Sequence, residues 1–175
     1  MTDYKEYINE TPNFPVEGIN FKDISPLLAN KEVFKQAVKD MGNLVCETWL
    51  DVPEYWIAVD ARGFLFAGAL SYAFGGGIVM CRKAGKLPGF TLNHFYRTEY
   101  SSDEISLQRG SGKVIIVDDV LATGGTLQSV NFLSESAGYE VVGNVVLVDL
   151  QYVPRVKESI LGEFDLEVKS LIQYE

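Results

Sequence analysis

The sequence contains little of what secreted, nucleic-acid-binding or metal-centred proteins need. Its 175 residues include only two cysteines and one histidine, too few for a disulfide framework or a cluster of metal ligands. We therefore interpret Cys46 and Cys81 as buried packing residues of a protein in a reducing compartment. Asp and Glu outnumber Lys and Arg by 24 to 15, so the formal net charge is −9. This surplus argues against general binding to nucleic acid or to anionic membranes, which favours positive charge.

Signals for secretion and for membrane insertion are also missing. The first ten residues lack a basic segment followed by an apolar run, so no signal peptide is evident. Nineteen residues from Gly63 to Cys81 carry no charge, but three consecutive glycines, 75–77, interrupt them. We interpret this segment as a buried helix, a turn and a buried strand rather than a membrane span. We expect a cytoplasmic protein.

Apolar patterning predicts one α/β domain over residues 1–175. Short apolar runs indicate strands at residues 55–59, 78–81, 113–117 and 141–150. Helical spacing of apolar residues predicts helices at 31–50, 64–74 and 126–137. Fully apolar strands that alternate with helices are typical of a central parallel sheet with helices on both faces. Such sheets bind ligands outside the carboxyl ends of their strands, so the loops after Val59 and Val117 are candidate sites.

The loop after Val117 combines two carboxylates with a turn of small residues. Asp118 and Asp119 follow the strand, and the turn that opens the next helix consists of Ala122, Thr123, Gly124, Gly125 and Thr126. Backbone N–H groups of such a turn, its hydroxyls and the helix N-terminus suit a phosphate monoester. The lysine of a nucleoside-triphosphate loop is absent. We therefore expect a phosphorylated sugar whose vicinal hydroxyls meet the carboxylates, directly or through a metal. The alternative is a strand end followed by a helix cap.

This run carries a family resemblance. Residues 114–126 resemble the 5-phosphoribosyl-1-pyrophosphate (PRPP) motif of type I phosphoribosyltransferases. Further segments resemble the adenine phosphoribosyltransferases of that superfamily: residues 14–26, 61–66, 82–89, 99–100 and 170–174. Together they follow the family's order along nearly the whole chain. The resemblance implies the type I phosphoribosyltransferase fold, with a small hood at about residues 1–30 and a mobile lid at about 85–107.

The resemblance also implies a reaction and a set of site residues. The chain would transfer the phosphoribosyl group of PRPP to adenine, giving AMP and pyrophosphate. Ribose and 5′-phosphate would bind Asp118, Asp119, Ala122, Thr123, Gly124, Gly125 and Thr126. Pyrophosphate would bind Arg62, Gly63 and Lys83. Adenine would lie against Asn20, Phe21, Lys22, Arg62 and Val120, recognised largely through backbone groups. The catalytic residues would be Glu99, which manages a proton on the purine, and Tyr100, which helps to close the lid.

Mg²⁺ is the implied cofactor, carried by PRPP and water without direct protein ligands, and the implied assembly is a homodimer.

Two features depart from the family: Asn20 replaces a more usual aliphatic residue, and the link at 108–112 is shorter than expected. One alternative is a transferase for hypoxanthine, guanine or xanthine, against which residues 14–26 and 82–89 argue. Another is a PRPP-binding transcriptional or RNA regulator without catalysis, against which the acidic charge and lack of spare length argue.

Overall fold

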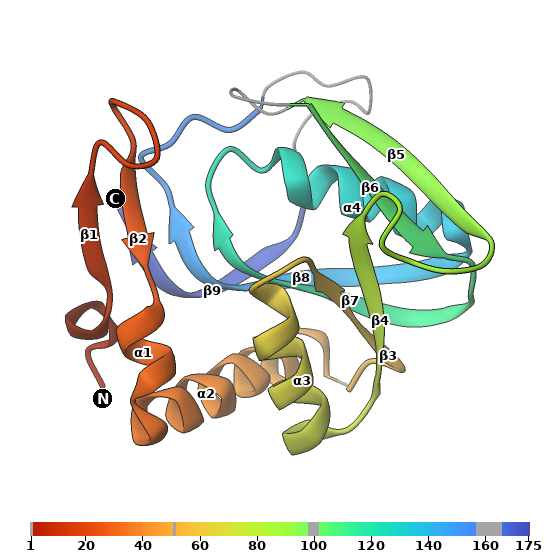
Figure 1. The fold of residues 1–175 in the computed structure, drawn as a ribbon. Coiled ribbons are helices and arrows are strands. Elements are labelled where there is room, and N and C mark those ends of the chain that lie inside the picture. The colour runs from red at the N-terminus through yellow and green to blue at the C-terminus, as the bar shows by residue number, and fades with distance from the viewer. Residues whose placement is uncertain (1, 51, 98–101, 157–165) are drawn as a thin grey trace.

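A seven-stranded sheet forms the centre of the molecule (Figure 1). The computed structural model describes residues 2–50, 52–97, 102–156 and 166–175. The strands of the main sheet, in their spatial order, are β5 (Thr91–Arg97), β6 (Ser102–Gln108), β4 (Gly77–Lys83), β3 (Tyr55–Val59), β7 (Gly112–Leu121), β8 (Tyr139–Leu150) and β9 (Val168–Tyr174). From β4 to β9 in this order neighbouring strands run parallel, whereas β5 and β6 form an antiparallel hairpin that joins the end of β4.

Helices cover both faces of this sheet. Helices α2 (Lys31–Trp49) and α3 (Gly63–Phe74) lie on one face, and α4 (Gly125–Ala137) lies on the other (Figure 1). Alternate residues of a strand point to opposite faces. Accordingly, Ile115 and Val117 of β7 enter the core beneath α2 and α3, while Val114 and Ile116 enter the core beneath α4. The α/β sheet with helices on both faces is confirmed.

Two expectations about strands need correction. The strand predicted to end at Val117 continues to Leu121, because β8 pairs with it as far as the Leu121–Asp149 register. The carboxylates Asp118 and Asp119 thus belong to β7. No strand was predicted in the segment 85–107, the expected lid, because its periodicity is weak; β5 and all of β6 except Gln108 lie there, paired residue by residue. Backbone pairing sets this hairpin, and its mixed polar composition conceals the strands.

The uncharged segment forms the predicted helix, turn and strand. Helix α3 ends at Phe74, and β4 begins at Gly77 after two glycines with positive φ. Within the described ranges, no helix has both the length and the apolar character needed to cross a bilayer. Cys81 is buried as expected, but Cys46 is only half-buried because it lies at the edge of the apolar stripe of α2.

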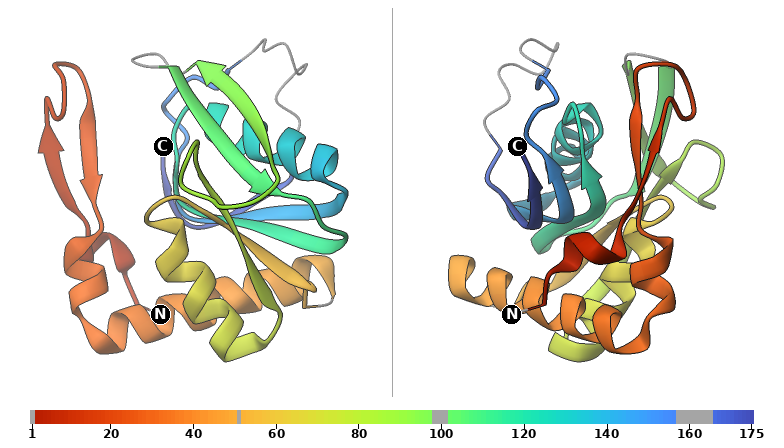
Figure 2. Two further views of the ribbon diagram at one scale, coloured as in Figure 1. Left: turned by 45° about the vertical axis from the view of Figure 1, so that its right-hand side comes forward. Right: turned by 90° about the vertical axis from the view of Figure 1, so that its left-hand side faces the viewer.

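The N-terminal segment stands beside the main sheet. It contains η1 (Tyr4–Tyr7), β1 (Asn9–Pro12), β2 (Asn20–Asp23) and α1 (Ser25–Ala29). Strands β1 and β2 form their own antiparallel hairpin, and Figure 2 shows this hairpin rising to one side of the sheet. The ammonium of Lys22 lies 4.2 Å from the ring centroid of Tyr174. The hairpin is therefore tied to β9, the last strand of the chain.

Candidate active site

The two loops singled out in the sequence lie at one edge of the sheet. Strand β3 runs parallel to β7, with Ala58 opposite Val117, so both strands deliver their following residues to the same place. Gly63 at the start of α3 allows close packing there. A Cβ on Gly63 would lie 2.6 Å from the backbone oxygen of Val117 and 3.3 Å from the Cα of Asp118. Only glycine lets α3 approach β7 this closely, which brings Arg62 beside the carboxylates.

Arg62 and Asp119 form the centre of the site. The Nε atom of Arg62 lies 2.8 Å from Oδ2 of Asp119. The carboxylate is buried, whereas the arginine side chain is 41% exposed. The N–H of Arg62 is not aligned with Oδ2, and no other donor of the described residues reaches that oxygen. Because buried acceptors are nearly always satisfied, Oδ2 is an acceptor suited to a ligand hydroxyl or a bound water.

Asp118 is the second buried carboxylate. Its Oδ1 accepts a hydrogen bond of 2.8 Å from the backbone N–H of Asp119. Burial, together with the neighbouring charge of Asp119, raises the pKa of Asp118 well above its usual range. Positive charge placed beside the pair would favour the ionised form of Asp118. A ligand that carries or develops positive charge would therefore favour ionisation of Asp118.

The turn after β7 leads into the N-terminus of α4. Gly124 adopts φ +88°, which glycine reaches without a steric penalty, and α4 begins at the next residue. As the N-cap residue, Gly124 has no side chain that could cap the first turn of α4. Its leading N–H groups therefore remain available to an anion, and the helix dipole favours negative charge there. Ala122, Thr123 and Thr126 are partly exposed, so a ligand can reach the turn.

The back of this turn is held by a segment that the sequence interpretation missed. Arg155 donates through Nη1 to the backbone oxygen of Ala122 and, at 3.2 Å, to that of Leu150. The N–H of Val156 donates to the oxygen of Thr123 at 2.9 Å. The available signal was the strand predicted at 141–150, which also ends at this edge and is followed by an arginine.

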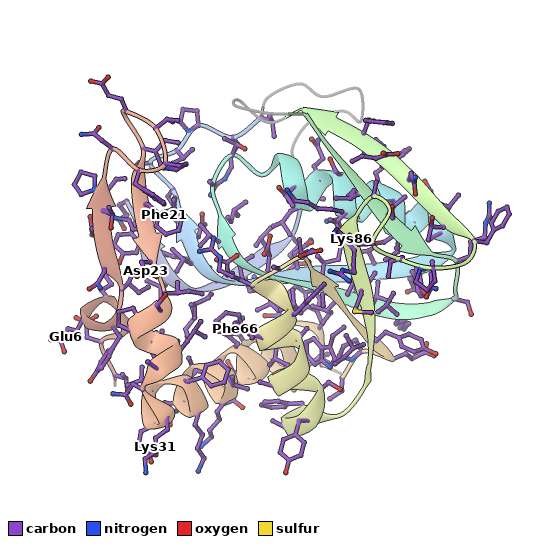
Figure 3. All side chains as sticks on the ribbon, viewed as in Figure 1. Glu6, Phe21, Asp23, Lys31, Phe66 and Lys86 are labelled. Carbon is purple, nitrogen blue, oxygen red and sulfur yellow. The ribbon has the colours of Figure 1, made fainter. Side chains whose placement is uncertain are left out.

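The N-terminal hairpin meets the site at Phe21. The guanidinium carbon of Arg62 lies 5.4 Å from the centroid of the Phe21 ring, and Phe14 packs edge-on against the same ring at 5.3 Å. Figure 3 shows Phe21 on β2 and Lys86 beyond β4, with the loop before α3 between them in this view. Arg62 therefore contacts the hairpin on one side and Asp119 on the other.

Asn20 and Lys22 direct their side chains to a different partner. Asn20 Nδ2 and Lys22 Nζ both contact Oε2 of Glu10, at 2.7 and 2.8 Å. Neighbouring residues of a strand point to opposite faces, so Phe21 alone of the three directs its side chain to Arg62. Glu10 thus engages Nδ2 of Asn20 and Nζ of Lys22, while the buried Oδ1 of Asn20 has no hydrogen-bond partner among the described residues. Val120 is half-buried against the core beneath α2 and α3.

Further cations gather at the end of β4. Arg82 donates from Nε to Oδ2 of Asp60 at 3.2 Å and from Nη1 to the backbone oxygen of Lys86 at 3.4 Å. It thereby joins the end of β3 to the turn after β4. Lys83 is exposed at the last position of β4, at the same edge of the sheet as Arg62. Glu99 and Tyr100 lie outside the described residues.

The fold and the residues at this edge of the sheet are those of a known class of protein. The family profile described as "Phosphoribosyl transferase domain" matches residues 54–159. The matched region runs from β3 past the end of β8 and includes Arg62, both carboxylates and the turn after β7. It omits the N-terminal hairpin, which carries Phe21. The matched region is that of a phosphoribosyltransferase.

Similar proteins narrow the class. Proteins named adenine phosphoribosyltransferase from Thermotoga sp. (strain RQ2) and Clostridium tetani are 42% and 41% identical, covering 98% and 99% of this chain and 99% of each relative. Among solved structures, the enzyme of Thermoanaerobacter pseudethanolicus has a TM-score of 0.85 at 35% identity, with 98% of both chains covered. That of Saccharomyces cerevisiae, complexed with an imino-altritol bisphosphate and adenine, has a TM-score of 0.86 at 32% identity, covering 97% of this chain and 96% of that one. The chain belongs to the adenine phosphoribosyltransferase family, as its sequence resemblance indicated.

Proposed function

We propose that this chain transfers the 5-phosphoribosyl group of PRPP to N9 of adenine, forming AMP and releasing pyrophosphate, through the residues at this edge of the sheet. The observation that carries the proposal is the position of Arg62. Its guanidinium contacts the ring of Phe21 and the carboxylate of Asp119. The phosphate turn directly follows β7, the strand that carries Asp119. The proposed binding positions for the base, the ribose and the 5′-phosphate therefore adjoin one another.

The 5′-phosphate binds the turn from Ala122 to Thr126. Support comes from the uncapped start of α4 and the left-handed Gly124, which together expose N–H groups to an anion. The ribose hydroxyls donate to the carboxylates of Asp118 and Asp119. The unsatisfied Oδ2 of Asp119 is the acceptor that this assignment requires. Such contacts hold the sugar with its C1 atom facing Arg62.

Pyrophosphate leaves as the bond between C1 and its oxygen breaks. Negative charge then grows on the leaving oxygen while the ribose gains oxocarbenium character. Arg62, Lys83 and the backbone at Gly63 stabilise the negative charge, and Asp118 and Asp119 stabilise the positive charge. Preorganised groups of this kind commonly supply the largest share of a rate enhancement. N9 of adenine attacks C1, and Glu99 is proposed to manage the proton that the purine loses.

Adenine lies between the N-terminal hairpin and the start of α3. The ring of Phe21 stacks on the base, Arg62 lies beside it, and Val120 adds an apolar contact. Backbone groups at Asn20 and Lys22 read the edge of the base. We assign residues 1–30, approximately, to a hood over adenine within a single domain of 1–175. The lid at 85–107 with Glu99 and Tyr100 stays a prediction.

Mg²⁺ is the proposed cofactor. The donors present fit a hydrated ion that arrives with the substrate, since Asp119 offers a buried oxygen without an aligned donor and Mg²⁺ prefers oxygen ligands and retains its waters. Asp118 and Asp119 would receive those waters. When bound, the ion neutralises charge on the diphosphate.

We also propose a homodimer, and a cytoplasmic location from the two free thiols. Large apolar side chains are exposed on α3 and β4: Leu65, Tyr72, Ile78 and Met80. Ile78 and Met80 pair in register with Trp56 and Ala58 of β3, which point into the core beneath α3. The exposed residues therefore share one face of the sheet with α3. An apolar face of this kind suits a second copy of the chain.

The test is product formation by the purified protein with PRPP, Mg²⁺ and one purine base at a time. We expect AMP from adenine and no product from hypoxanthine, guanine or xanthine. Turnover of one of those oxopurines instead would keep the PRPP site and overturn the assignment of the base. Binding of PRPP without turnover of any base would favour the regulatory alternative.

A further inference from the structure

The loop that receives the phosphate is anchored from behind by the chain that leaves β8. The oxygen of Ala122 accepts from Arg155, and the oxygen of Thr123 accepts from the N–H of Val156 at 2.9 Å. Arg155 also pairs through Nη2 with Oδ1 of Asp149. The parallel register of β7 and β8 explains this proximity, since Leu121 lies opposite Asp149 at the ends of the two strands.

Anchoring these two oxygens orients two N–H groups. The oxygen of Ala122 belongs to the same peptide plane as the N–H of Thr123, and the oxygen of Thr123 shares its plane with the N–H of Gly124. In a planar trans peptide the oxygen and the N–H point in opposite directions. Donors behind the loop therefore turn both N–H groups toward its front. A charged donor also polarises the peptide and strengthens the hydrogen bond that its N–H can give.

The remaining contacts of Arg155 keep its guanidinium in place. Asp149 Oδ1 accepts from Nη2, and the oxygen of Leu150 accepts from Nη1 at 3.2 Å. The side chain of Arg155 is 24% exposed and that of Asp149 is 15% exposed, so this pair is screened from solvent on most sides. A single guanidinium thus joins the end of β8, a carboxylate and the phosphate turn, a geometry that suits the planar fork of arginine and not an ammonium group.

We propose that Arg155, held by Asp149, is a positioning residue for the phosphate turn: it sets the N–H groups of Thr123 and Gly124 to receive the 5′-phosphate of the substrate. This inference rests on the proposed function, because it deepens the assignment of the turn as the phosphate site. Arg155 acts through the loop and does not touch the reacting atoms.

The experiment compares Arg155→Ala and Arg155→Lys with the exposed Arg109→Ala as the matched control. We expect Arg155→Ala to raise the KM for PRPP and the Kd for ribose 5-phosphate about tenfold or more, as for loss of a charge-assisted hydrogen bond. The KM for adenine should change little, and Arg109→Ala should match the unaltered protein. Added guanidinium ion should partly restore ribose 5-phosphate binding to Arg155→Ala, whereas Arg155→Lys should remain weak.

A purely structural role would produce a different pattern. Equal changes in the KM values for PRPP and adenine, or a lower Tm with unchanged ribose 5-phosphate binding, would overturn the proposal. If Arg155→Ala does not fold, Asp149→Asn provides the second test, with the same selective loss of ribose 5-phosphate affinity expected. Failure of the unaltered protein to form AMP from PRPP and adenine would overturn the proposed function itself, an outcome distinct from a variant that behaves like the unaltered protein.

Discussion

Gly63 determines how closely the two halves of the site approach one another. It lies at the start of α3, and the space that a side chain would need is filled by the backbone of Val117 and Asp118. Backbone atoms of a central strand cannot move aside as the end of a flexible side chain can. The contact between Arg62 and Asp119 thus depends on the lack of a side chain at Gly63.

Gly63→Ala should push α3 away from β7. We expect the free energy of unfolding to fall by about 1–3 kcal/mol, as for overpacking of a tight contact, and product inhibition by pyrophosphate to weaken because Arg62 moves with the helix. Urea unfolding and inhibition kinetics would measure the two effects. Gly68→Ala is the control in the same helix, since its added methyl group meets nothing within 4 Å. It should gain up to about 1 kcal/mol from helix propensity. Equal effects of the two substitutions would contradict this account.

Asp118 illustrates a residue whose environment opposes its charge. Burial and the adjacent Asp119 raise its pKa, so the folded protein retains a proton that the unfolded chain releases at about pH 4. The folded state therefore binds more protons than the unfolded state, and stability falls as pH rises through the interval between the two pKa values.

Asp118→Asn should remove this loss of stability. We expect the variant to be more stable than the unaltered protein at about pH 8, by about 1–3 kcal/mol, and the difference to shrink toward about pH 5. Urea unfolding across that range provides the measurement. The exposed Glu17→Gln serves as the control and should show no such trend. A variant that loses stability relative to the unaltered protein as pH rises would show that Asp118 is stabilised as an anion.

At the scale of elements, the N-terminal hairpin depends on a small polar cluster. Glu10 accepts hydrogen bonds from Lys22 and Asn20. Both bonds lower the pKa of Glu10, and the bond from Lys22 has the larger effect. Lys22 has a side chain only 3% exposed and lies over the ring of Tyr174. The cluster thus links β1, β2 and β9. The face of β2 that carries Phe21 is positioned by contacts on its opposite face.

Glu10→Ala should therefore affect adenine more than PRPP. Removal of the carboxylate leaves the buried ammonium of Lys22 without its counter-ion, at a cost of about 1.5–3 kcal/mol, and loosens the hairpin against β9. We expect a higher KM for adenine with a smaller change in the KM for PRPP. Steady-state kinetics with each substrate varied in turn would measure this. Glu17→Ala, in the exposed turn of the same hairpin, is the control. Unchanged kinetics in both variants would show that the cluster around Glu10 does not affect adenine binding.

At the scale of the whole molecule, charge and exposed apolar surface have different roles. The chain carries a net charge of −9, yet Arg62, Lys83 and Arg155 lie at the edge that is proposed to receive an anionic substrate. Local donors, rather than the overall field, must therefore hold PRPP. The exposed apolar residues of α3 and β4 form a second surface, for which a second copy of the chain is the proposed partner.

Met80→Glu tests this second surface. We expect the unaltered protein to sediment with about twice the mass of one chain, and the variant to shift toward the mass of a single chain because a buried charge opposes association. Leu50→Glu adds the same charge at the exposed end of α2 and should keep the larger mass. Sedimentation equilibrium at several concentrations provides the measurement. A single-chain mass for the unaltered protein would refute the homodimer.

The local sequence determined the elements and the chemistry at the ends of the strands. Apolar runs such as 55–59 and 113–117 specify strands because period and β-branching are local properties. The order of Asp118, Asp119 and the turn to Thr126 predicts a phosphate-binding loop, because adjacent residues in a turn cannot be far apart in space. The family resemblance could also be recognised from the sequence alone, since its segments lie in order along the chain.

Only the tertiary structure decided which distant residues meet. Phe21 reaches Arg62 because the N-terminal hairpin is pinned to β9, and Arg155 reaches Ala122 because β8 ends beside β7. Neither contact has a spacing signature, since both depend on strand order and register. The β5–β6 hairpin was missed for the same reason: its strands are defined by pairing with each other and not by an apolar pattern. Local propensity determined the helices and strands, whereas packing at the carboxyl ends of the strands determined which residues form the candidate active site.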